Sequence, residues 1–346
     1  MLPTIWFFIW AVLWAVFFMT DGYNLGLGSL LFFVTKTQKD RRLAISTMAP
    51  FWDPNQVWLI AAGGMTFAVF PIVYATLFSS LYLGMMLLLF GLIFRSVAYE
   101  LREKSDHPVW KKFWDGSLVF GSFLPTILFG IVFANLFCGM PIDAQGTLRG
   151  GLLAIFHPYA FVGALLFFAM FTLHGLLWLA VKTQGNLNNL AISQAKNFWW
   201  LMLVALIVFL PASAFATNLY HNYRHHPILL IFPIIIIAAL ILIRIFLATK
   251  STWKAFFASA GMIFFITIAA FTGLYPNIVP STLNPSYSLT IQNAASSNLT
   301  LKIMLIVVSI FVPIIILYQA WANYIFRNKV SEKEAIYDET SPSVIK

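Results

Sequence analysis

Two carboxylates stand out because each lies beside or within a long apolar stretch. Asp21 follows a run of aromatic and aliphatic residues and precedes Gly22. In a continuous helix it would lie roughly 20 Å from Lys36, deep in a bilayer. A carboxylate there could hold and release a proton near neutral pH, because burial disfavours its charged form. The alternative is that Asp21 is hydrogen-bonded to a neighbouring helix and serves packing.

The second carboxylate, Asp53, opens another apolar stretch in the motif Phe51-Trp52-Asp53-Pro54-Asn55-Gln56-Val57-Trp58. Asp before Pro is a common helix start, so Asp53 could simply cap free N–H groups. A carboxylate at an aqueous helix end could also collect protons, and Asn55 and Gln56 would extend a polar path inward. The flanking Trp52 and Trp58 are also typical interface anchors.

Other polar residues near the spans have ordinary explanations as well. Arg95 is predicted at a span end, near the height of Asp53, where it would either pair with a neighbouring helix end or snorkel to the surface. Glu100 is predicted in a solvated loop. His174 lies within a span and could ligate a haem, which would also need a second axial ligand, or could be a hydrogen-bonded packing residue.

The composition requires a membrane to position these groups. Of 346 residues, 60% are hydrophobic and 10% are charged, which excludes a water-soluble globule. The single cysteine, Cys138, excludes a disulfide framework, and no metal site or nucleotide motif is predicted. Hydropathy predicts an all-α polytopic protein with nine spans, at 3–34, 55–74, 77–94, 117–137, 158–181, 198–217, 228–248, 255–275 and 303–326.

The basic residues report the topology rather than a nucleic-acid partner. Connections on one side of the predicted spans, with the C-terminal tail, hold 18 of the 21 Lys and Arg residues. The positive-inside rule therefore places the N-terminus outside and the C-terminus in the cytoplasm. We expect one transmembrane domain, 1–326, and a short solvated tail, 327–346, with a weak helical start.

Three stretches together resemble subunit II of the cytochrome bd-type quinol oxidases, including their cyanide-insensitive relatives. The first is Thr20-Asp21-Gly22-Tyr23-Asn24-Leu25-Gly26-Leu27-Gly28, followed by Asp40-Arg41-Arg42. The second and most specific is Ala49-Pro50-Phe51-Trp52-Asp53-Pro54-Asn55-Gln56-Val57-Trp58-Leu59 with Ala62-Gly63-Gly64. The third joins Phe94-Arg95 to Val279-Pro280-Ser281-Thr282, Ser288-Leu289-Thr290 and Ala295-Ser296-Ser297.

The resemblance implies helical bundles plus a peripheral helix, in a subunit of a bacterial inner-membrane oxidase. Such an oxidase transfers electrons from quinol to O₂ and takes protons from the cytoplasm. Haem b and haem d would be ligated by the partner, subunit I, while this chain would support assembly and the proton pathway. The resemblance leaves open the quinone used, a variant with haem b alone, a small third subunit and a bound structural quinone.

Carried over residue by residue, the proton-pathway role falls on Asp53 and Asp21, with Glu100 as a weaker candidate and Arg95 as a supporting charge. Asn24 stands where relatives can carry Asp, so one carboxylate of the pattern is absent. The expected separation of roughly 20 Å between the two main carboxylates exceeds a direct proton hop, so water or polar groups must bridge it. A helix break within residues 22–28 would shorten that distance.

Two alternatives from other classes remain at this stage. A proton-coupled secondary transporter could use the same intramembrane carboxylate, and the Gly-rich first span is compatible with a broken helix. A membrane cytochrome in its own right would need a second axial ligand opposite His174.

Overall fold

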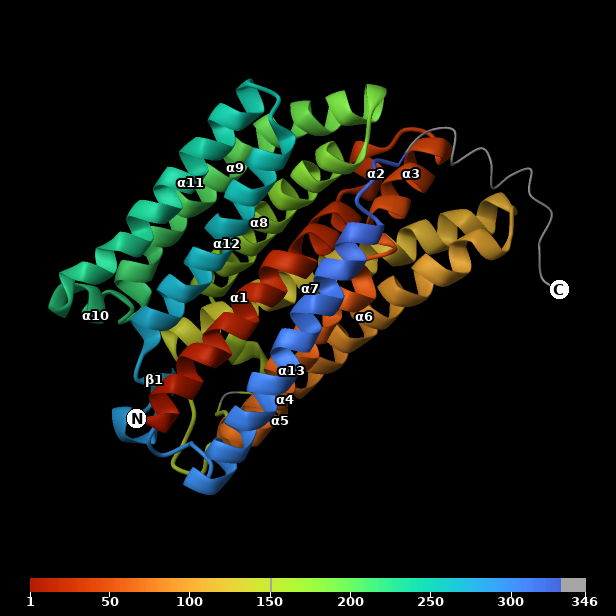
Figure 1. The fold of residues 1–346 in the computed structure, drawn as a ribbon. Coiled ribbons are helices and arrows are strands. Elements are labelled where there is room, and N and C mark those ends of the chain that lie inside the picture. Colours follow the sequence, from red (N-terminus) through yellow and green to blue (C-terminus); the bar gives the residue numbers. More distant parts are fainter. Residues whose placement is uncertain (150, 331–346) are drawn as a thin grey trace.

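The computed structural model describes residues 1–149 and 151–330. Its long helices run side by side through the molecule (Figure 1). The membrane-length helices are α1 (Leu2–Ser29), α6 (Tyr82–Leu101) with η1 (Arg102–Lys104), α7 (Pro108–Cys138), α8 (Pro158–Lys182), α9 (Gly185–Ala216), η3 (Pro227–Leu230) with α11 (Ile231–Ala248), α12 (Thr252–Leu274) and α13 (Asn298–Ile325). A ninth apolar unit is formed by α4 (Trp52–Val69) and α5 (Pro71–Ser80), bent by 117° at the break between them. The all-helical membrane architecture is therefore confirmed.

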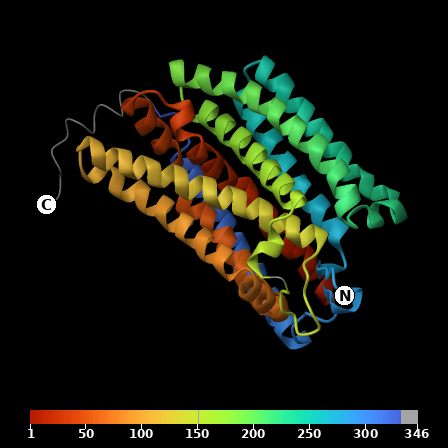
Figure 2. The same ribbon diagram turned by 180° about the vertical axis from the view of Figure 1, so that it is seen from behind.

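The helices form two groups and one peripheral helix. The first group contains α1, α4, α5, α6 and α7, while α8, α9, α11 and α12 form the second (Figures 1 and 2). Contacts of α8 with α1 and α7, together with those of α1 with α12, join the two groups. Helix α13 packs mainly on α4 and buries only Leu301 and Ala322, so it is the expected peripheral helix.

Helix α1 lies against α8 at a distance that only glycine permits. A Cβ atom on Gly26 would stand 1.8 Å from the backbone oxygen of Phe171, and one on Gly175 would stand 2.4 Å from the amide nitrogen of Leu27. The small residues of the first span therefore serve close helix packing. Helix α1 continues unbroken through residues 22–28, so the break considered for this stretch is absent.

Several helix limits differ from the hydropathy prediction. Helix α1 ends at Ser29, and a separate short helix α2 (Leu31–Val34) follows it. The turn after α4 falls at Phe70, before Pro71, because proline fits the first turn of the helix that begins there. Helices α7 and α9 begin well before the predicted 117 and 198, because their first turns are polar and escape a hydropathy window.

One end of the bundle, which we call the basic end, carries most of the cationic connections. It includes α3 (Gln38–Met48), which starts with a capping box between Thr37 and Asp40, and η1. Met1 and the end of α13 lie at opposite ends of the bundle (Figure 1). Residues 331–346 of the predicted tail, with its expected helical start, lie outside the described residues.

The opposite end is closed by short elements and contains no separate domain within the described residues. A small antiparallel pair, β1 (Asn277–Val279) and β2 (Leu289–Thr290), flanks η4 (Pro285–Tyr287). The Ser281 hydroxyl donates to the Ile142 carbonyl, which ties this connection to the segment after α7. Helix α10 (Tyr220–His225) and η2 (Leu152–Ile155) complete this end.

Candidate functional site

A buried ion pair lies at the centre of the first helix group. Arg95 Nη2 of α6 donates to Asp21 Oδ2 of α1 at 2.7 Å, and both side chains are 0% exposed. The mutual attraction offsets part of the cost of removing both charges from water. Arg95 therefore neither snorkels nor pairs with Asp53, and both predictions for it are wrong. The physical reason is that α6 continues to Leu101, which places Arg95 inside the bundle.

The ion pair is surrounded by polar atoms that have no protein partner. Asn24 Nδ2 donates to Asp21 Oδ1 at 3.0 Å, but Asn24 Oδ1 accepts nothing. Arg95 Nε and Nη1 are also buried without an acceptor. Since buried polar groups are almost always hydrogen-bonded, such a cluster has the chemistry of a small hydrated site.

A line of neutral polar side chains joins the start of α4 to α1 at the residues that flank Asp21. Asn55 Nδ2 donates to the Thr20 carbonyl at 2.6 Å and to the Tyr23 hydroxyl at 2.9 Å. Asn55 Oδ1 accepts from Gln319 Nε2 of α13 at 2.7 Å, and Gln319 Oε1 accepts from Trp58 Nε1 at 2.7 Å. These contacts join three helices beside Asp21.

The two other predicted carboxylates share a pocket at the basic end. Asp53 and Glu100 are exposed side chains that line a pocket of about 560 Å³. Its other walls come from Trp52 and from the last turns of α13, including Tyr318 and Trp321. Glu100 lies in the last turn of α6 rather than in the predicted loop. The structure thus brings Asp53 and Glu100 together, and it holds Asp21 apart from them in the protein interior.

The position of Asp53 corrects two sequence-based expectations. Asp53 lies in the first turn of α4, whose N-cap is Phe51, and no side chain caps this helix. The capping alternative is therefore wrong. Asp53 also lies two residues before Asn55, about 3 Å along the helix, and Asn55 contacts the residue before Asp21. The expected axial separation of roughly 20 Å is wrong, because the first turns of α4 lie beside Thr20 rather than at the level of Lys36.

The remaining predicted side chains lie around this line. Trp52 stacks on Tyr99 with ring centroids 6.1 Å apart, and the Tyr99 hydroxyl is 3.7 Å from the Met48 sulfur. Trp58 holds Gln319, as described above. Gln56 is half-buried, and its amide nitrogen has no hydrogen-bond partner.

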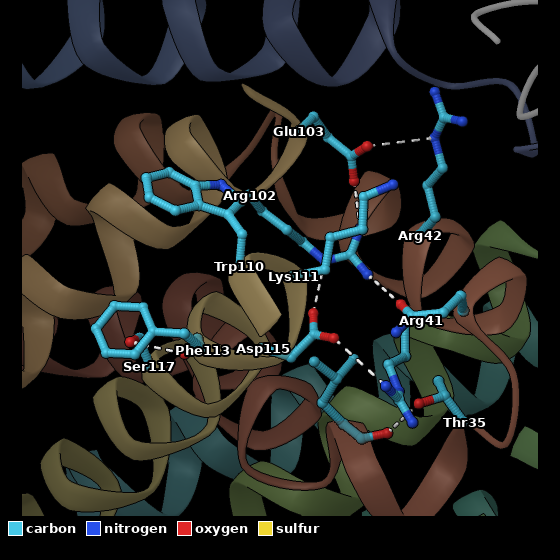
Figure 3. Close-up of polar contacts among 12 residues, drawn as sticks. Thr35, Arg41, Arg42, Arg102, Glu103, Trp110, Lys111, Phe113, Asp115 and Ser117 are labelled. Carbon is cyan, nitrogen blue, oxygen red and sulfur yellow. Dashed lines mark hydrogen bonds and ion pairs between the residues drawn. The ribbon is translucent and has the colours of Figure 1, made fainter. Parts of the chain in front are cut away.

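A second buried carboxylate, Asp115, escaped the sequence analysis. It lies on α7 with a 0% exposed side chain, and Arg102 Nε donates to it at 2.5 Å while Arg41 Nη1 lies at 3.5 Å. Arg102 also contacts Glu103, which Arg42 approaches at 3.9 Å (Figure 3). Pro108 at the helix start was the available signal, because a helix beginning there places Asp115 two turns inside.

His174 forms hydrogen bonds through both ring nitrogens. Nε2 lies 3.0 Å from the Met19 carbonyl and must donate to it, while Nδ1 lies 3.0 Å from the Ser259 hydroxyl. The ring also stacks on Phe256 with centroids 4.5 Å apart. This geometry is that of the hydrogen-bonded packing histidine, and it leaves no free nitrogen for a haem iron.

Lys182, at the end of α8, is a further functional candidate that sequence reasoning missed. Its ammonium donates to the carbonyls of Phe326 and Asn328 just after α13, and the Val330 amide donates back to the Lys182 carbonyl at 2.9 Å. The ammonium also lies 5.1 Å from the centre of the Phe51 ring. These contacts fix the end of α13, which forms one wall of the Asp53 pocket.

An apolar pocket of about 530 Å³ lies between α7 and the second helix group. Its walls come from α7, α8, α9, α11 and α12, and they include Phe133, Phe167, Leu206 and Ile236. Such a lining suits a hydrocarbon chain or an apolar ring.

Fold and site together define a polytopic membrane protein. One of its helix groups contains a buried ion pair and, next to it, hydrogen-bonded polar side chains. Residues 2–326 match the family model described as cytochrome bd terminal oxidase subunit II, and the chain belongs to this family. The family membership does not favour the transporter alternative.

Individual relatives agree with this assignment. The chain is 34% identical over 334 residues to the cytochrome bd ubiquinol oxidase subunit 2 of Bacillus subtilis, covering 96% of this chain and 98% of the relative. It is 31% identical over 365 residues to the cytochrome bd-I ubiquinol oxidase subunit 2 of Escherichia coli K12, covering 95% of each chain. A chain in the structure of bd oxidase from Geobacillus thermodenitrificans has the same fold, with a TM-score of 0.76 at 13% identity, over 95% of this chain and 99% of that chain.

Proposed function

We propose that this chain acts as the subunit without haem ligands of a quinol:oxygen oxidoreductase in a bacterial inner membrane. In this role it supports assembly of the haem-bearing subunit I and provides part of the route by which protons enter from the cytoplasm. The observation that carries the proposal is the placement of an open acidic pocket at the start of α4, where Asn55 contacts Thr20, the residue before the enclosed Asp21 that pairs with Arg95.

Protons would enter this route at the basic end. The basic residues there favour a cytoplasmic location, which also places the N-terminus outside. Asp53 and Glu100 offer two exposed carboxylates in one pocket, so they can exchange protons with water. From there a proton would pass Asn55 and Tyr23 with the help of bound water, because an amide alone does not relay protons.

The ion pair gives Asp21 a specific electrostatic role. While Arg95 balances the charge of Asp21, the pair is neutral as a unit. A proton that reaches this point would meet one enclosed carboxylate whose charge Arg95 balances, and it would be passed onward from there. The unpartnered Asn24 Oδ1 and Arg95 N–H groups would hold the water that carries the proton.

The haem ligands of the complex are assigned to the partner subunit. His174, the sequence candidate in this chain, uses both ring nitrogens in hydrogen bonds, which does not fit an axial ligand. The apolar pocket between α7 and the second helix group is our candidate site for a structural quinone or a lipid chain. Mass spectrometry of molecules that co-purify with the oxidase would identify its occupant.

The substitution Asp53→Asn tests the proton route with little change in shape. We expect quinol oxidase turnover to fall about tenfold, the size of effect typical of losing one proton-transfer group partly backed up by another. Turnover per haem and the reduced-minus-oxidised spectrum are measured on the purified complex. Full turnover would refute the proton role, while loss of the haem spectrum would indicate a structural role.

Asp106→Asn is the matched control. Asp106 is an exposed carboxylate in the connection before α7, and it pairs with Lys111 at 2.7 Å outside the line of polar side chains. The Lys111 hydrogen bond lowers the pKa of Asp106, so the control also removes an ionised carboxylate at the assay pH. We expect its turnover to equal that of the unmodified oxidase.

A further inference from the structure

The peripheral helix α13 inserts one polar side chain, Gln319, into the first helix group, and the chemistry of its partners fixes the direction of its hydrogen bonds. Gln319 accepts a hydrogen bond from Trp58 Nε1 at 2.7 Å and donates one to Asn55 Oδ1 at 2.7 Å. An indole N–H can only donate and a backbone carbonyl can only accept, so Trp58 at one end and Thr20 at the other fix the direction of every bond between them.

This direction determines the state of the Tyr23 hydroxyl. Because Gln319 donates to Asn55 Oδ1, the Asn55 amide nitrogen must face α1, where it donates to the Thr20 carbonyl and to the Tyr23 oxygen. The Tyr23 oxygen is therefore an acceptor from Asn55, and its own proton remains available for another acceptor. With Gln319 absent, Asn55 Oδ1 would lose its donor, and only the contacts of Asn55 Nδ2 with α1 would hold the amide.

Packing alone does not explain this contact. Helix α13 buries only two residues, and most of its apolar side chains face outward. It is attached at three polar points, namely Trp6 Nε1 to the Leu301 carbonyl at 3.1 Å, Gln319, and the Lys182 contacts after its last turn. Gln319 is the only one of these three that reaches the line beside Asp21.

We propose that Gln319 is a positioning residue for proton transfer, which anchors the Asn55 amide from the side of α13, so that the Tyr23 oxygen stays an acceptor and the Tyr23 proton stays free. This inference rests on the proposed function and deepens it. It also gives α13 a functional role. When this peripheral helix packs correctly on α4, Gln319 would fix which atoms donate and which accept in the hydrogen bonds of Asn55.

The substitution Gln319→Glu tests the inference through pH. A neutral carboxyl group can accept from Trp58 and donate to Asn55 as the amide does, whereas the ionised form can only accept. We expect near-normal turnover at about pH 6 and a loss of about three- to tenfold by about pH 9, since burial keeps a carboxyl group neutral to higher pH. The ionisable groups around this position are Asp53 and Glu100 in the pocket, Tyr23 through Asn55, and the Asp21–Arg95 pair.

Two further variants separate orientation from shape. Gln319→Met keeps the length of the side chain but forms neither hydrogen bond, so turnover should fall about three- to tenfold at every pH. Asn323→Asp places the same new charge one turn later on α13, at an exposed residue, and should leave the pH profile unchanged. In the Gln319→Met variant, kcat should fall with little change in the KM for quinol, and the solvent deuterium isotope effect on kcat should rise.

The possible outcomes distinguish this inference from the function on which it rests. Unmodified turnover and pH profiles in both Gln319 variants, with Asp53→Asn still slow, would overturn the role of Gln319 and leave the proton route intact. Full turnover in Asp53→Asn would refute the route itself. Loss of the haem spectrum in Gln319→Glu at low pH, where its hydrogen bonds are retained, would also overturn the inference.

Discussion

Two buried carboxylates in this chain have arginine partners at nearly the same distance, yet their surroundings differ. Asp115 is 2.5 Å from Arg102, and Asp21 is 2.7 Å from Arg95. Asp115 lies at the basic end among further charges, where Arg41 and Glu103 extend the ionic network (Figure 3). Asp21 lies among neutral polar groups inside the helix group.

We interpret the two ion pairs from the groups that surround them. The Asp115 network joins α3, η1 and α7, and Arg102 Nη2 also donates to Gln38 at 3.0 Å, so these contacts fasten three elements together. Around Asp21, by contrast, Arg95 and Asn24 retain unpartnered polar atoms, and a line of side chains leads toward an open pocket. We therefore interpret Asp115 as structural and Asp21 as a proton-transfer group.

Replacing Asp115 should have the largest effect, and that effect should be on stability. Asp115→Asn leaves the buried Arg102 without its main countercharge, which typically costs about 3 to 5 kcal/mol. We expect less assembled oxidase and a lower unfolding temperature. Both are measured through the haem absorbance of the complex. Turnover per haem in the surviving complex should be normal. Unchanged stability, or a specific loss of turnover, would remove the distinction between the two sites.

Removing Asp21 together with its partner Arg95 should give the opposite result to the Asp115 substitution, namely normal assembly with low turnover. Asp21→Asn alone leaves Arg95 uncompensated and should reduce assembly. The double variant Asp21→Asn/Arg95→Gln removes both charges and should restore the haem spectrum, while turnover per haem stays about 100-fold low. If the double variant turns over normally, the carboxylate carries no protons.

These two sites also show which features of the molecule can be predicted from the sequence and which cannot. The apolar spans could be predicted from hydropathy, and a peripheral helix from the family resemblance. The sequence also marked Asp21 and Asp53 as candidates, and their role stays a prediction. The partner of Asp21 could not be predicted, since Arg95 is distant in the chain and its height depends on where α6 ends. Asp115 was missed because it precedes the predicted span start at 117, in the polar first turns of α7.

Gln319 illustrates the same limit for uncharged residues. A single amide barely changes the mean hydropathy of a span, so the sequence treats 303–326 as an ordinary apolar helix. Its importance arises only from the rotation of α13, which directs that amide toward Asn55. Which face a helix presents to its neighbours is set by tertiary packing, which one sequence does not specify.

The smallest predicted effect concerns the open end of the route, and it tests whether the pocket acts as one proton-collecting unit. Glu100→Gln should lower turnover only about two- to threefold, because Asp53 lines the same pocket and remains exposed to water. In combination with Asp53→Asn, it should lower turnover by more than the product of the two single effects, because no carboxylate then remains there. Steady-state turnover per haem at several buffer concentrations provides the measurement, since a mobile buffer can partly replace a lost surface carboxylate.

Strictly multiplicative effects would instead mean that Glu100 acts independently of Asp53. The pocket would then be a passive opening to the enclosed Asp21–Arg95 pair.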